Sequence, residues 1–327
     1  MHLLVTGGCG FIGSAFVAWL RRERPAWRLT VVDALTYAGR RENLAGLLGP
    51  DCVLVEGDVA DPAFVTRLFA GLDPAPAALV HFAAETHVDR SLTDPIPFVR
   101  TNVMGTSLLL DAWRALGAGR FVQISTDEVY GALLPGEPPC DERQPLRPTN
   151  PYAATKAAAD LLVLAGHRSF GLDALIVRST NTYGPRQLPE KLIPRLLVRA
   201  LTGQPLPIYG AGRAVRDWLH VDDAVRGILA VLEGGRAGEV YHLAGEQPRA
   251  AAEVAAALGA RLGLPATRIV AVPDRPAHDQ RYALDLSKTR RELGWEPTVP
   301  FSAGLAATID WYLGHRDWWE PLRDRAD

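Results

Sequence analysis

Short apolar stretches alternate with longer segments of helical character along the first 180 residues. The apolar stretches end in turn residues, and they predict strands at His2–Thr6, Arg28–Asp33, Cys52–Asp58, Ala78–Ala84, Arg120–Thr126 and Asp173–Asn181. The intervening segments predict helices at Phe11–Arg24, Arg41–Leu48, Pro62–Gly71, Pro95–Leu116 and Pro151–Phe170. Strands that alternate with helices in this way predict an α/β fold built on a doubly wound parallel sheet.

The regular alternation of strands and helices ends after Asn181, where prolines become frequent. Further helices are expected at Lys191–Thr202, Val221–Leu232, Ala250–Leu262, Ser287–Leu293 and Ser302–Leu313, with one more strand at Glu239–Ala244. We therefore expect a Rossmann-type NAD-binding domain over residues 1–180, to which residues of about 215–245 return. Residues 181–327 would form a smaller, mostly helical, substrate-binding region that is interleaved with it.

Composition excludes several classes of function. The 327 residues are 48% hydrophobic, and 35 basic against 37 acidic residues leave a formal charge of −2, so nucleic acid is not an expected partner. Cys9, Cys52 and Cys140 lie far apart without a CxxC pair, which argues against disulfides and against a metal site. No window approaches the roughly 18 apolar residues of a membrane span. These features favour a cytoplasmic protein without a membrane partner.

A glycine-rich turn follows the first strand and opens the first helix. Gly7, Gly10 and Gly13 stand where a backbone must approach a pyrophosphate at a helix N-terminus. Asp33 ends the second strand, at the distance where a carboxylate binds an adenosine ribose, and it would repel a 2′-phosphate. Asp58, after the third strand, suits the adenine amino group. The pattern predicts NAD as cofactor; ordinary turn glycines and capping aspartates are the alternative.

Two groups of residues suit acid–base chemistry. Tyr152 and Lys156 are four residues apart and so share one face of a helix, where an ammonium and a positive nicotinamide ring would both favour the phenolate. Thr126, Asp127 and Glu128 stand at the carboxyl end of the fifth strand, where open α/β sheets bind ligands. A coincidental helical spacing and a polar turn that caps the next helix are the structural alternatives.

The glycine spacing and the Tyr-Lys pair resemble the extended short-chain dehydrogenase/reductase family along essentially the whole chain. The resemblance implies that Asn102 is a structural polar residue of its helix. It also implies a cofactor site that contains, besides the residues above, Phe11, Ile12, Ala34, Leu35, Thr36, Val59, Phe82, Ala83 and Ala84. Tyr152 and Lys156 would contact the cofactor as well.

The Thr126-Asp127-Glu128 motif resembles that of the nucleotide-sugar 4,6-dehydratases within this family. That resemblance implies that a nucleoside-diphosphate glucose, dTDP-glucose foremost, loses water to give the 4-keto-6-deoxy sugar. Tyr152 would take the O4 proton with help from Lys156 and Thr126, Glu128 the C5 proton, and Asp127 would protonate the C6 hydroxyl. The implied substrate-binding residues are Thr86, His87, Thr126, Asn181, Glu190, Lys191, Leu192, Pro207, Tyr209, Arg216, Arg275 and His278.

Other interpretations stay open at this point. A UDP-sugar 4-epimerase or a UDP-glucuronate decarboxylase would use the same scaffold, but an epimerase has no use for the Asp-Glu pair. A non-catalytic NAD-binding regulator would not need the catalytic residues. The sequence leaves the nucleotide open among dTDP, UDP, GDP and CDP. The family resemblance implies that the apolar-rich helices Pro95–Leu116 and Pro151–Phe170 form a homodimer through a four-helix bundle, and helices that merely pack on the sheet are the alternative.

Overall fold

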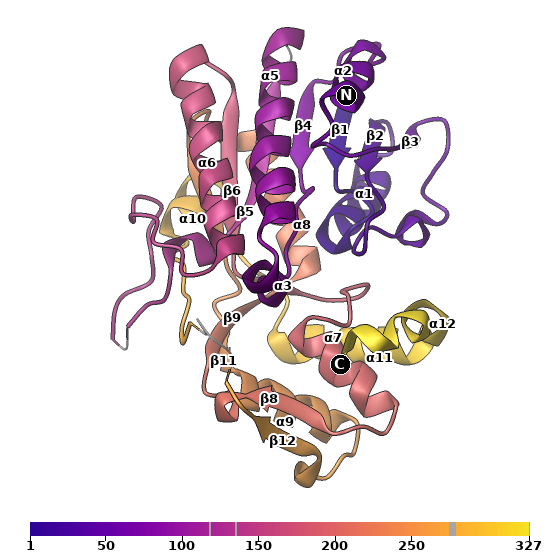
Figure 1. The fold of residues 1–327 in the computed structure, drawn as a ribbon, viewed down its shortest axis with the longest axis vertical. Coiled ribbons are helices and arrows are strands. Elements are labelled where there is room, and N and C mark those ends of the chain that lie inside the picture. The colour runs from indigo at the N-terminus through magenta and orange to yellow at the C-terminus, as the bar shows by residue number, and fades with distance from the viewer. Residues whose placement is uncertain (118, 135, 275–278, 327) are drawn as a thin grey trace.

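A seven-stranded parallel sheet forms the larger part of the protein in a computed structural model, which describes residues 1–117, 119–134, 136–274 and 279–326 (Figure 1). Its strands are β1 (His2–Thr6), β2 (Arg28–Asp33), β3 (Cys52–Glu56), β4 (Ala78–His81), β5 (Arg120–Thr126), β6 (Ala174–Ser179) and β10 (Val240–Leu243). They are ordered β10-β6-β5-β4-β1-β2-β3, and every neighbouring pair is parallel. The predicted fold class is confirmed.

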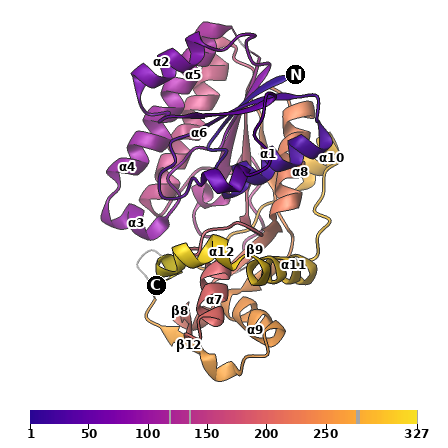
Figure 2. The same cartoon turned by 90° about the vertical axis from the view of Figure 1, so that its right-hand side faces the viewer.

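Helices cover both faces of this sheet, which is why its strands read as continuous apolar runs. One face carries α1 (Phe11–Glu23), α8 (Val221–Gly234) and α10 (Ser287–Leu293), and the other carries α2 (Pro62–Ala70), α5 (Thr106–Leu116) and α6 (Pro151–Phe170) (Figure 2). Along β1, Leu3 and Val5 join the core on the first face, and Leu4 joins the core on the second. Successive side chains of a strand point to opposite faces, so both layers are held by the same short segment.

A smaller part lies below the carboxyl ends of the strands (Figure 1). Its helices are α7 (Leu192–Leu201), α9 (Ala251–Arg261), α11 (Phe301–Gly314) and α12 (Arg316–Trp319). They pack with a three-stranded sheet of β7 (Asn181–Tyr183), β9 (Val215–His220) and β11 (Pro248–Ala250), and with the pair β8 (Leu206–Tyr209) and β12 (Ile269–Val272). A separate apolar core holds this part together. Between β9 and β11 the chain returns to the large sheet as α8 and β10.

Several predicted elements differ from the structure. The helix expected at Arg41–Leu48 is wrong: only a 3₁₀ turn, Arg41–Leu44, forms there, and Gly46 takes a left-handed φ of 74°. The long helix expected at Pro95–Leu116 consists of α4 (Ile96–Phe98), a π-helical stretch Val99–Gly105 and α5. Helices α3 (Val88–Thr93) and α12 and the strands of the two small sheets were not predicted from the sequence. No helix within the residues placed here is long and apolar enough to cross a membrane.

Candidate active site

A cavity of about 540 Å³ opens between the carboxyl ends of the central strands and the smaller part. This is the place where open α/β sheets bind ligands, and the volume is in the range of small-molecule sites. The predicted residues that line it are Gly7, Gly10, Phe11, Ile12, Gly13, Asp33, Ala34, Thr36, Asp58, Val59, Phe82, Ala83, Ala84, Thr86, His87, Thr126, Asp127, Glu128, Tyr152, Lys156, Asn181, Glu190, Lys191, Leu192, Pro207, Tyr209 and Arg216. Leu35 does not line it, and Arg275 and His278 lie outside the described residues.

The glycine-rich turn is shaped by contacts that only glycine permits. Gly7 has a φ of 71°, and a Cβ on Gly13 would lie 2.2 Å from the Gly7 carbonyl oxygen. Helix α1 begins directly after Gly10, and no side chain caps it. The backbone N–H groups of its first turn have no partner within the helix, so this end of α1 suits a phosphate.

The Asp33 carboxylate accepts backbone hydrogen bonds from the glycine-rich turn and from the loop that follows β2. Its Oδ2 accepts a hydrogen bond from the Cys9 N–H at 2.8 Å, and its Oδ1 accepts one from the Leu35 N–H at 2.9 Å. Burial raises the pKa of this carboxyl, and the two N–H groups oppose that effect. Leu35 therefore contributes to the site through its backbone, while the Asp33 carboxylate keeps lone pairs for a ribose.

Asp58 has a partner that the sequence did not predict. The Arg100 guanidinium lies 2.7 Å from Asp58 Oδ2, and the Ala60 N–H donates to Asp58 Oδ1 at 2.8 Å. Arg100 comes from the π-helical stretch and lines the cavity. An adenine that lies at Asp58 would therefore meet an arginine as well as a carboxylate.

Tyr152 and Lys156 are both buried on α6, which starts with Asn150 as its N-cap and Pro151 in its first turn. Lys156 Nζ donates to the Ile124 carbonyl at 2.6 Å, and burial lowers the pKa of Lys156 to about 8. Burial, followed by the nearby Glu128 charge, raises the pKa of Tyr152. Desolvation and the neighbouring carboxylates therefore favour the neutral phenol in the protein without its cofactor, whereas the phenolate was expected with a positive nicotinamide ring present.

The three residues at the end of β5 lie in distinct surroundings. Thr126 caps the short turn Asp127–Tyr130, and its hydroxyl accepts the Glu128 N–H at 3.3 Å. Asp127 is only 3% exposed, and its Oδ2 has no hydrogen-bond partner among the residues that the structure describes. Burial and then the Glu128 charge raise its pKa well above the usual range. Glu128 Oε2 instead accepts a hydrogen bond of 3.3 Å from Asn150 Nδ2. Burial thus favours the protonated form of Asp127, whereas the neighbouring Glu128 has the Asn150 amide as a hydrogen-bond donor.

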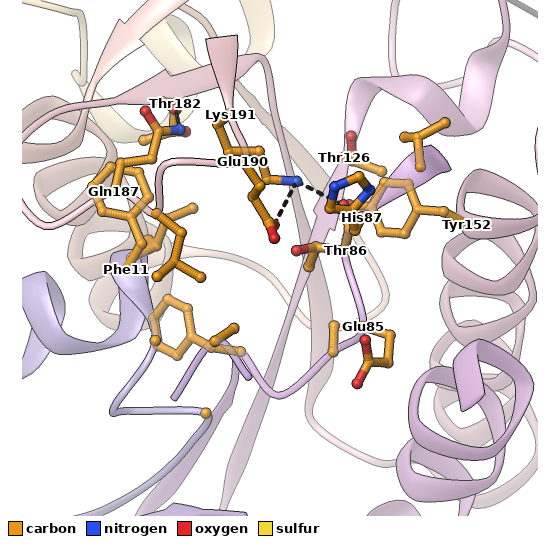
Figure 3. Close-up of a pocket in the computed structure, with 18 of the residues that line it drawn as sticks. Phe11, Glu85, Thr86, His87, Thr126, Tyr152, Thr182, Gln187, Glu190 and Lys191 are labelled. Atoms are coloured by element: carbon orange, nitrogen blue, oxygen red, sulfur yellow. Dashed lines mark hydrogen bonds and ion pairs between the residues drawn. The ribbon is translucent and has the colours of Figure 1, made fainter. Parts of the chain in front are cut away.

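Polar atoms face the middle of the cavity, as Figure 3 shows for Thr86, Glu190 and Lys191. Lys191 Nζ donates to the Thr86 carbonyl at 2.8 Å and lies 3.6 Å from Glu190 Oε1. Glu190 Oε1 and Asn181 Oδ1 are buried, and neither has a hydrogen-bond partner among the residues placed in the structure. Buried acceptors without donors fit a ligand that carries hydroxyl groups.

The far end of the cavity contains Pro207, Tyr209 and Arg216. Arg216 donates to the Val215 carbonyl at 2.9 Å and to the Asp279 carbonyl at 2.8 Å, and its guanidinium covers the Tyr282 ring. These contacts fix the orientation of the guanidinium, while it remains part of the cavity wall.

Three of the residues that sequence reasoning missed make polar contacts at this site. Asn150 was detectable, because an asparagine directly before a proline and an apolar helical run is a typical N-cap. Arg100 and Arg195 carry no local signal that separates them from solvent-exposed arginines. They line the cavity because of the π-helical stretch and of α7.

The doubly wound sheet, the glycine-rich turn and the Tyr152-Lys156 pair are those of the extended short-chain dehydrogenases/reductases. The model of the GDP-mannose 4,6 dehydratase family matches residues 4–308, and the chain belongs to that family. It is 50% identical to a dTDP-glucose 4,6-dehydratase of Streptomyces niveus, over 99% of this chain and 96% of the relative.

Solved structures agree with this assignment. The dTDP-glucose 4,6-dehydratase DesIV of Streptomyces venezuelae, solved with NAD and dTDP bound, superposes with a TM-score of 0.94 at 48% identity, over 98% of this chain and 100% of that one. The UDP-glucose 4-epimerase of Thermotoga maritima superposes with a TM-score of 0.89 at 30% identity, over 96% and 99%. The scaffold is thus shared with epimerases, and the site residues must separate the activities.

Proposed function

We propose that the protein is an NAD-dependent dTDP-glucose 4,6-dehydratase, which converts dTDP-glucose to dTDP-4-keto-6-deoxyglucose and water. The observation that carries the proposal is the pair Asp127 and Glu128, two adjacent carboxyl groups in one cavity whose surroundings differ. Burial favours the protonated form of Asp127, whereas Glu128 accepts a hydrogen bond from Asn150. Titratable neighbours in opposed environments are the mark of an acid and a base that act in one reaction.

The residues of the glycine-rich turn fit NAD. Gly7 and Gly13 leave room for a backbone approach that a Cβ would close, and α1 offers its N-terminus to the pyrophosphate. The buried Asp33 carboxylate suits a free ribose and rejects a 2′-phosphate. NAD supplies the acceptor for the C4 hydride and returns that hydride to C6, so it is not consumed.

Proton transfer at O4 falls to Tyr152. Its side chain is buried beside Glu128, Lys156 stabilises the phenolate form from the same helix face, and that phenolate takes the O4 proton as the sugar is oxidised. The Thr126 hydroxyl, at the end of β5, orients the O4 group. A bound, positively charged nicotinamide ring would favour that phenolate further.

Elimination falls to the two carboxyl groups. The new 4-ketone acidifies C5, and Glu128 removes the C5 proton while Asp127 gives its proton to the departing C6 hydroxyl, which leaves as water. Glu128 then returns its proton to C5. Over one turnover Tyr152 gains the O4 proton and Asp127 loses one proton to the departing hydroxyl. Transfer of a proton from Tyr152 to Asp127 through solvent restores both groups.

A competition assay tests this function. The enzyme is offered dTDP-, UDP-, GDP- and CDP-glucose together, and the products are identified by mass spectrometry. We expect loss of water from the dTDP sugar in preference to the others, with no net change in added NAD. Formation of a dTDP-galactose epimer without loss of water would instead indicate an epimerase, and absence of any turnover would indicate a regulator.

We also propose that the enzyme is a homodimer. Apolar side chains on the outer side of α4, the following π-helical stretch and α6 are exposed: Ile96 by 69%, Leu161 by 58% and Phe170 by 60%. A patch of this kind on neighbouring helices supports a four-helix bundle with a second copy.

A cytoplasmic location is proposed because Cys9, Cys52 and Cys140 are all free and buried, as expected in a reducing compartment.

A further inference from the structure

The C-terminal segment, Arg316–Ala326, crosses from the smaller part to the cofactor side of the large sheet. Figure 2 shows α12 between the sheet above and the helices of the smaller part below. Trp318 of α12 is buried, and its indole Nε1 donates a hydrogen bond of 2.8 Å to Asn43 Oδ1. Asn43 lies in the 3₁₀ turn that follows β2, so this bond joins opposite ends of the chain.

Asn43 in turn forms a hydrogen bond to the glycine-rich turn. Only 2% of Asn43 is exposed, and its Nδ2 donates to the Cys9 carbonyl at 2.9 Å, an oxygen that also accepts the Arg40 N–H at 3.0 Å. An indole N–H can only donate and a carbonyl can only accept, so the two neighbours fix the orientation of the amide. Asn43 is therefore a bridge with a single arrangement.

Cys9 is the link to the predicted ribose ligand. It stands between Gly8 and Gly10 in the glycine-rich turn, and its N–H donates to Asp33 Oδ2 at 2.8 Å. The Cys9 peptide groups are thus held by Asn43 through the carbonyl and by Asp33 through the N–H. A continuous series of hydrogen bonds runs from Trp318 through Asn43 and Cys9 to the Asp33 carboxylate.

The end of the same segment contacts two other parts of the chain: the loop that follows β2, and helix α7. The Arg325 guanidinium donates to the Tyr37 carbonyl, and Arg195 Nε of α7 donates to the Ala326 carbonyl at 3.1 Å. Arg195 also donates to the Tyr209 hydroxyl at 3.4 Å, and both of these residues line the cavity. The segment therefore contacts the cofactor side and the nucleotide side at once.

We propose that Trp318 and Asn43 are positioning residues for cofactor retention: through them the C-terminal segment clamps the glycine-rich turn and Asp33. The inference rests on the proposed binding of NAD. A turn that is already fixed loses little conformational freedom when the dinucleotide binds, which strengthens binding and slows release. Slow release suits an enzyme that returns its hydride within each turnover and has no need to exchange the cofactor.

Two neighbouring tryptophans provide a matched test. Trp318→Phe removes the donor to Asn43 and keeps an aromatic ring in place. Trp319→Phe is the control, because the Trp319 indole donates to the Tyr312 carbonyl at 2.7 Å and makes no bond to the cofactor side. The rate at which bound NAD exchanges with isotopically labelled NAD is measured for both variants and for the parent.

We expect exchange about tenfold faster in Trp318→Phe, since Asn43 Oδ1 would be buried without its donor. Trp319→Phe should exchange like the parent, and dTDP should bind all three proteins equally. Asn43→Asp provides a second variant that keeps the acceptor for Trp318 and loses the donor to Cys9. It should also release NAD faster than the parent.

The outcomes separate the clamp from the proposed function. A parent that binds NAD, with Trp318→Phe and Asn43→Asp both exchanging at the parent rate, overturns the clamp and leaves the function standing. Equal acceleration in Trp318→Phe and Trp319→Phe also overturns it, because general loosening of the segment would then be the cause. A parent that binds no NAD overturns both.

Discussion

In the proposed reaction, Asp127 and Glu128 provide an acid and a base from the end of one strand. They are adjacent in sequence, yet Asp127 Oδ2 is buried and has no donor within the described part of the chain, whereas Glu128 accepts a hydrogen bond from the Asn150 amide. The raised pKa of Asp127 follows from those surroundings rather than from the residue type. The chemistry assigned to the two residues can be separated by substitution, because each moves a different proton.

Tyr152→Phe and Glu128→Gln should fail at different steps. Without its phenol, Tyr152→Phe cannot take the O4 proton, so we expect a loss of at least about a hundredfold in turnover and no 4-keto sugar of any kind. Glu128→Gln keeps that oxidation and should accumulate a 4-keto-glucose that retains its C6 hydroxyl. Mass spectrometry of quenched mixtures in deuterated water distinguishes them, since Glu128→Gln should not incorporate deuterium at C5. Normal yields of the 4-keto-6-deoxy product from Glu128→Gln would falsify the assigned roles.

Asp127→Asn tests the acid separately. The amide cannot protonate the C6 hydroxyl, so loss of water should slow by roughly a hundredfold while the C5 proton still exchanges. The measurement is deuterium at C5 in recovered, undehydrated sugar. If exchange stops together with dehydration, Asp127 is not the separate acid proposed here.

Lys156 predicts the alkaline limit of the oxidation step. Burial lowers its pKa from 10.5 to about 8, so the ammonium form dominates below pH 8 and is lost as the pH rises above it. Formation of the 4-keto sugar should therefore decline above about pH 8. The profile is recorded in Asp127→Asn, which removes the titration of the acid. Lys156→Arg stays charged, and a profile in that variant that still declines at pH 8 would contradict this explanation.

At the scale of elements, the start of α6 combines a helix cap with a contact to the base. Asn150 Oδ1 accepts the Ala153 N–H at 2.9 Å, while Nδ2 reaches Glu128. Asn150→Ala should lower the free energy of unfolding by about 1 kcal/mol through the lost cap. Asn150→Ser keeps a cap and should leave stability close to the parent, yet both variants should slow C5 proton exchange because Glu128 loses the hydrogen bond from the Asn150 amide.

Urea unfolding and C5 deuterium exchange measure the two effects. Asp61→Ala is the control, because Asp61 caps α2 through the Ala63 N–H at 2.9 Å, and neither residue lines the cavity. It should lose stability by a similar amount without a change in exchange. Should Asn150→Ser exchange C5 at the parent rate, the amide would be a cap only.

At the scale of the whole molecule, the exposed face of α4 and α6 predicts assembly. Leu161→Glu places a charge within an apolar surface that the proposed bundle buries, so it should shift the protein from dimer to monomer at micromolar concentration. Light scattering across that range gives the mass. Leu313→Glu is the control, since Leu313 is 53% exposed on α11 of the smaller part. A parent that is already monomeric would exclude the dimer.

The sequence by itself determined the features that depend on neighbours along the chain. Strands buried on both faces show continuous apolar runs, so β1 to β6 were recognisable, and the turn at Gly7–Gly13 was evident from spacing alone. The Tyr152-Lys156 pair follows from helical periodicity in the same way. Where local signals competed, the prediction was wrong: the apolar residues of 41–48 suggested a helix, but Gly46 and the Asn43 bridge hold a short turn.

Only the tertiary structure decided which distant groups meet. The contacts Arg100–Asp58, Asn150–Glu128 and Trp318–Asn43 each join residues from separate elements, and no local pattern specifies them. The pKa of a carboxyl group depends on burial in the same way, because the pKa of Asp127 is raised by desolvation that arises only when the chain is packed. Spacing along the sequence therefore identified the candidate residues of the site, and tertiary packing decided which groups they contact and how their pKa values shift.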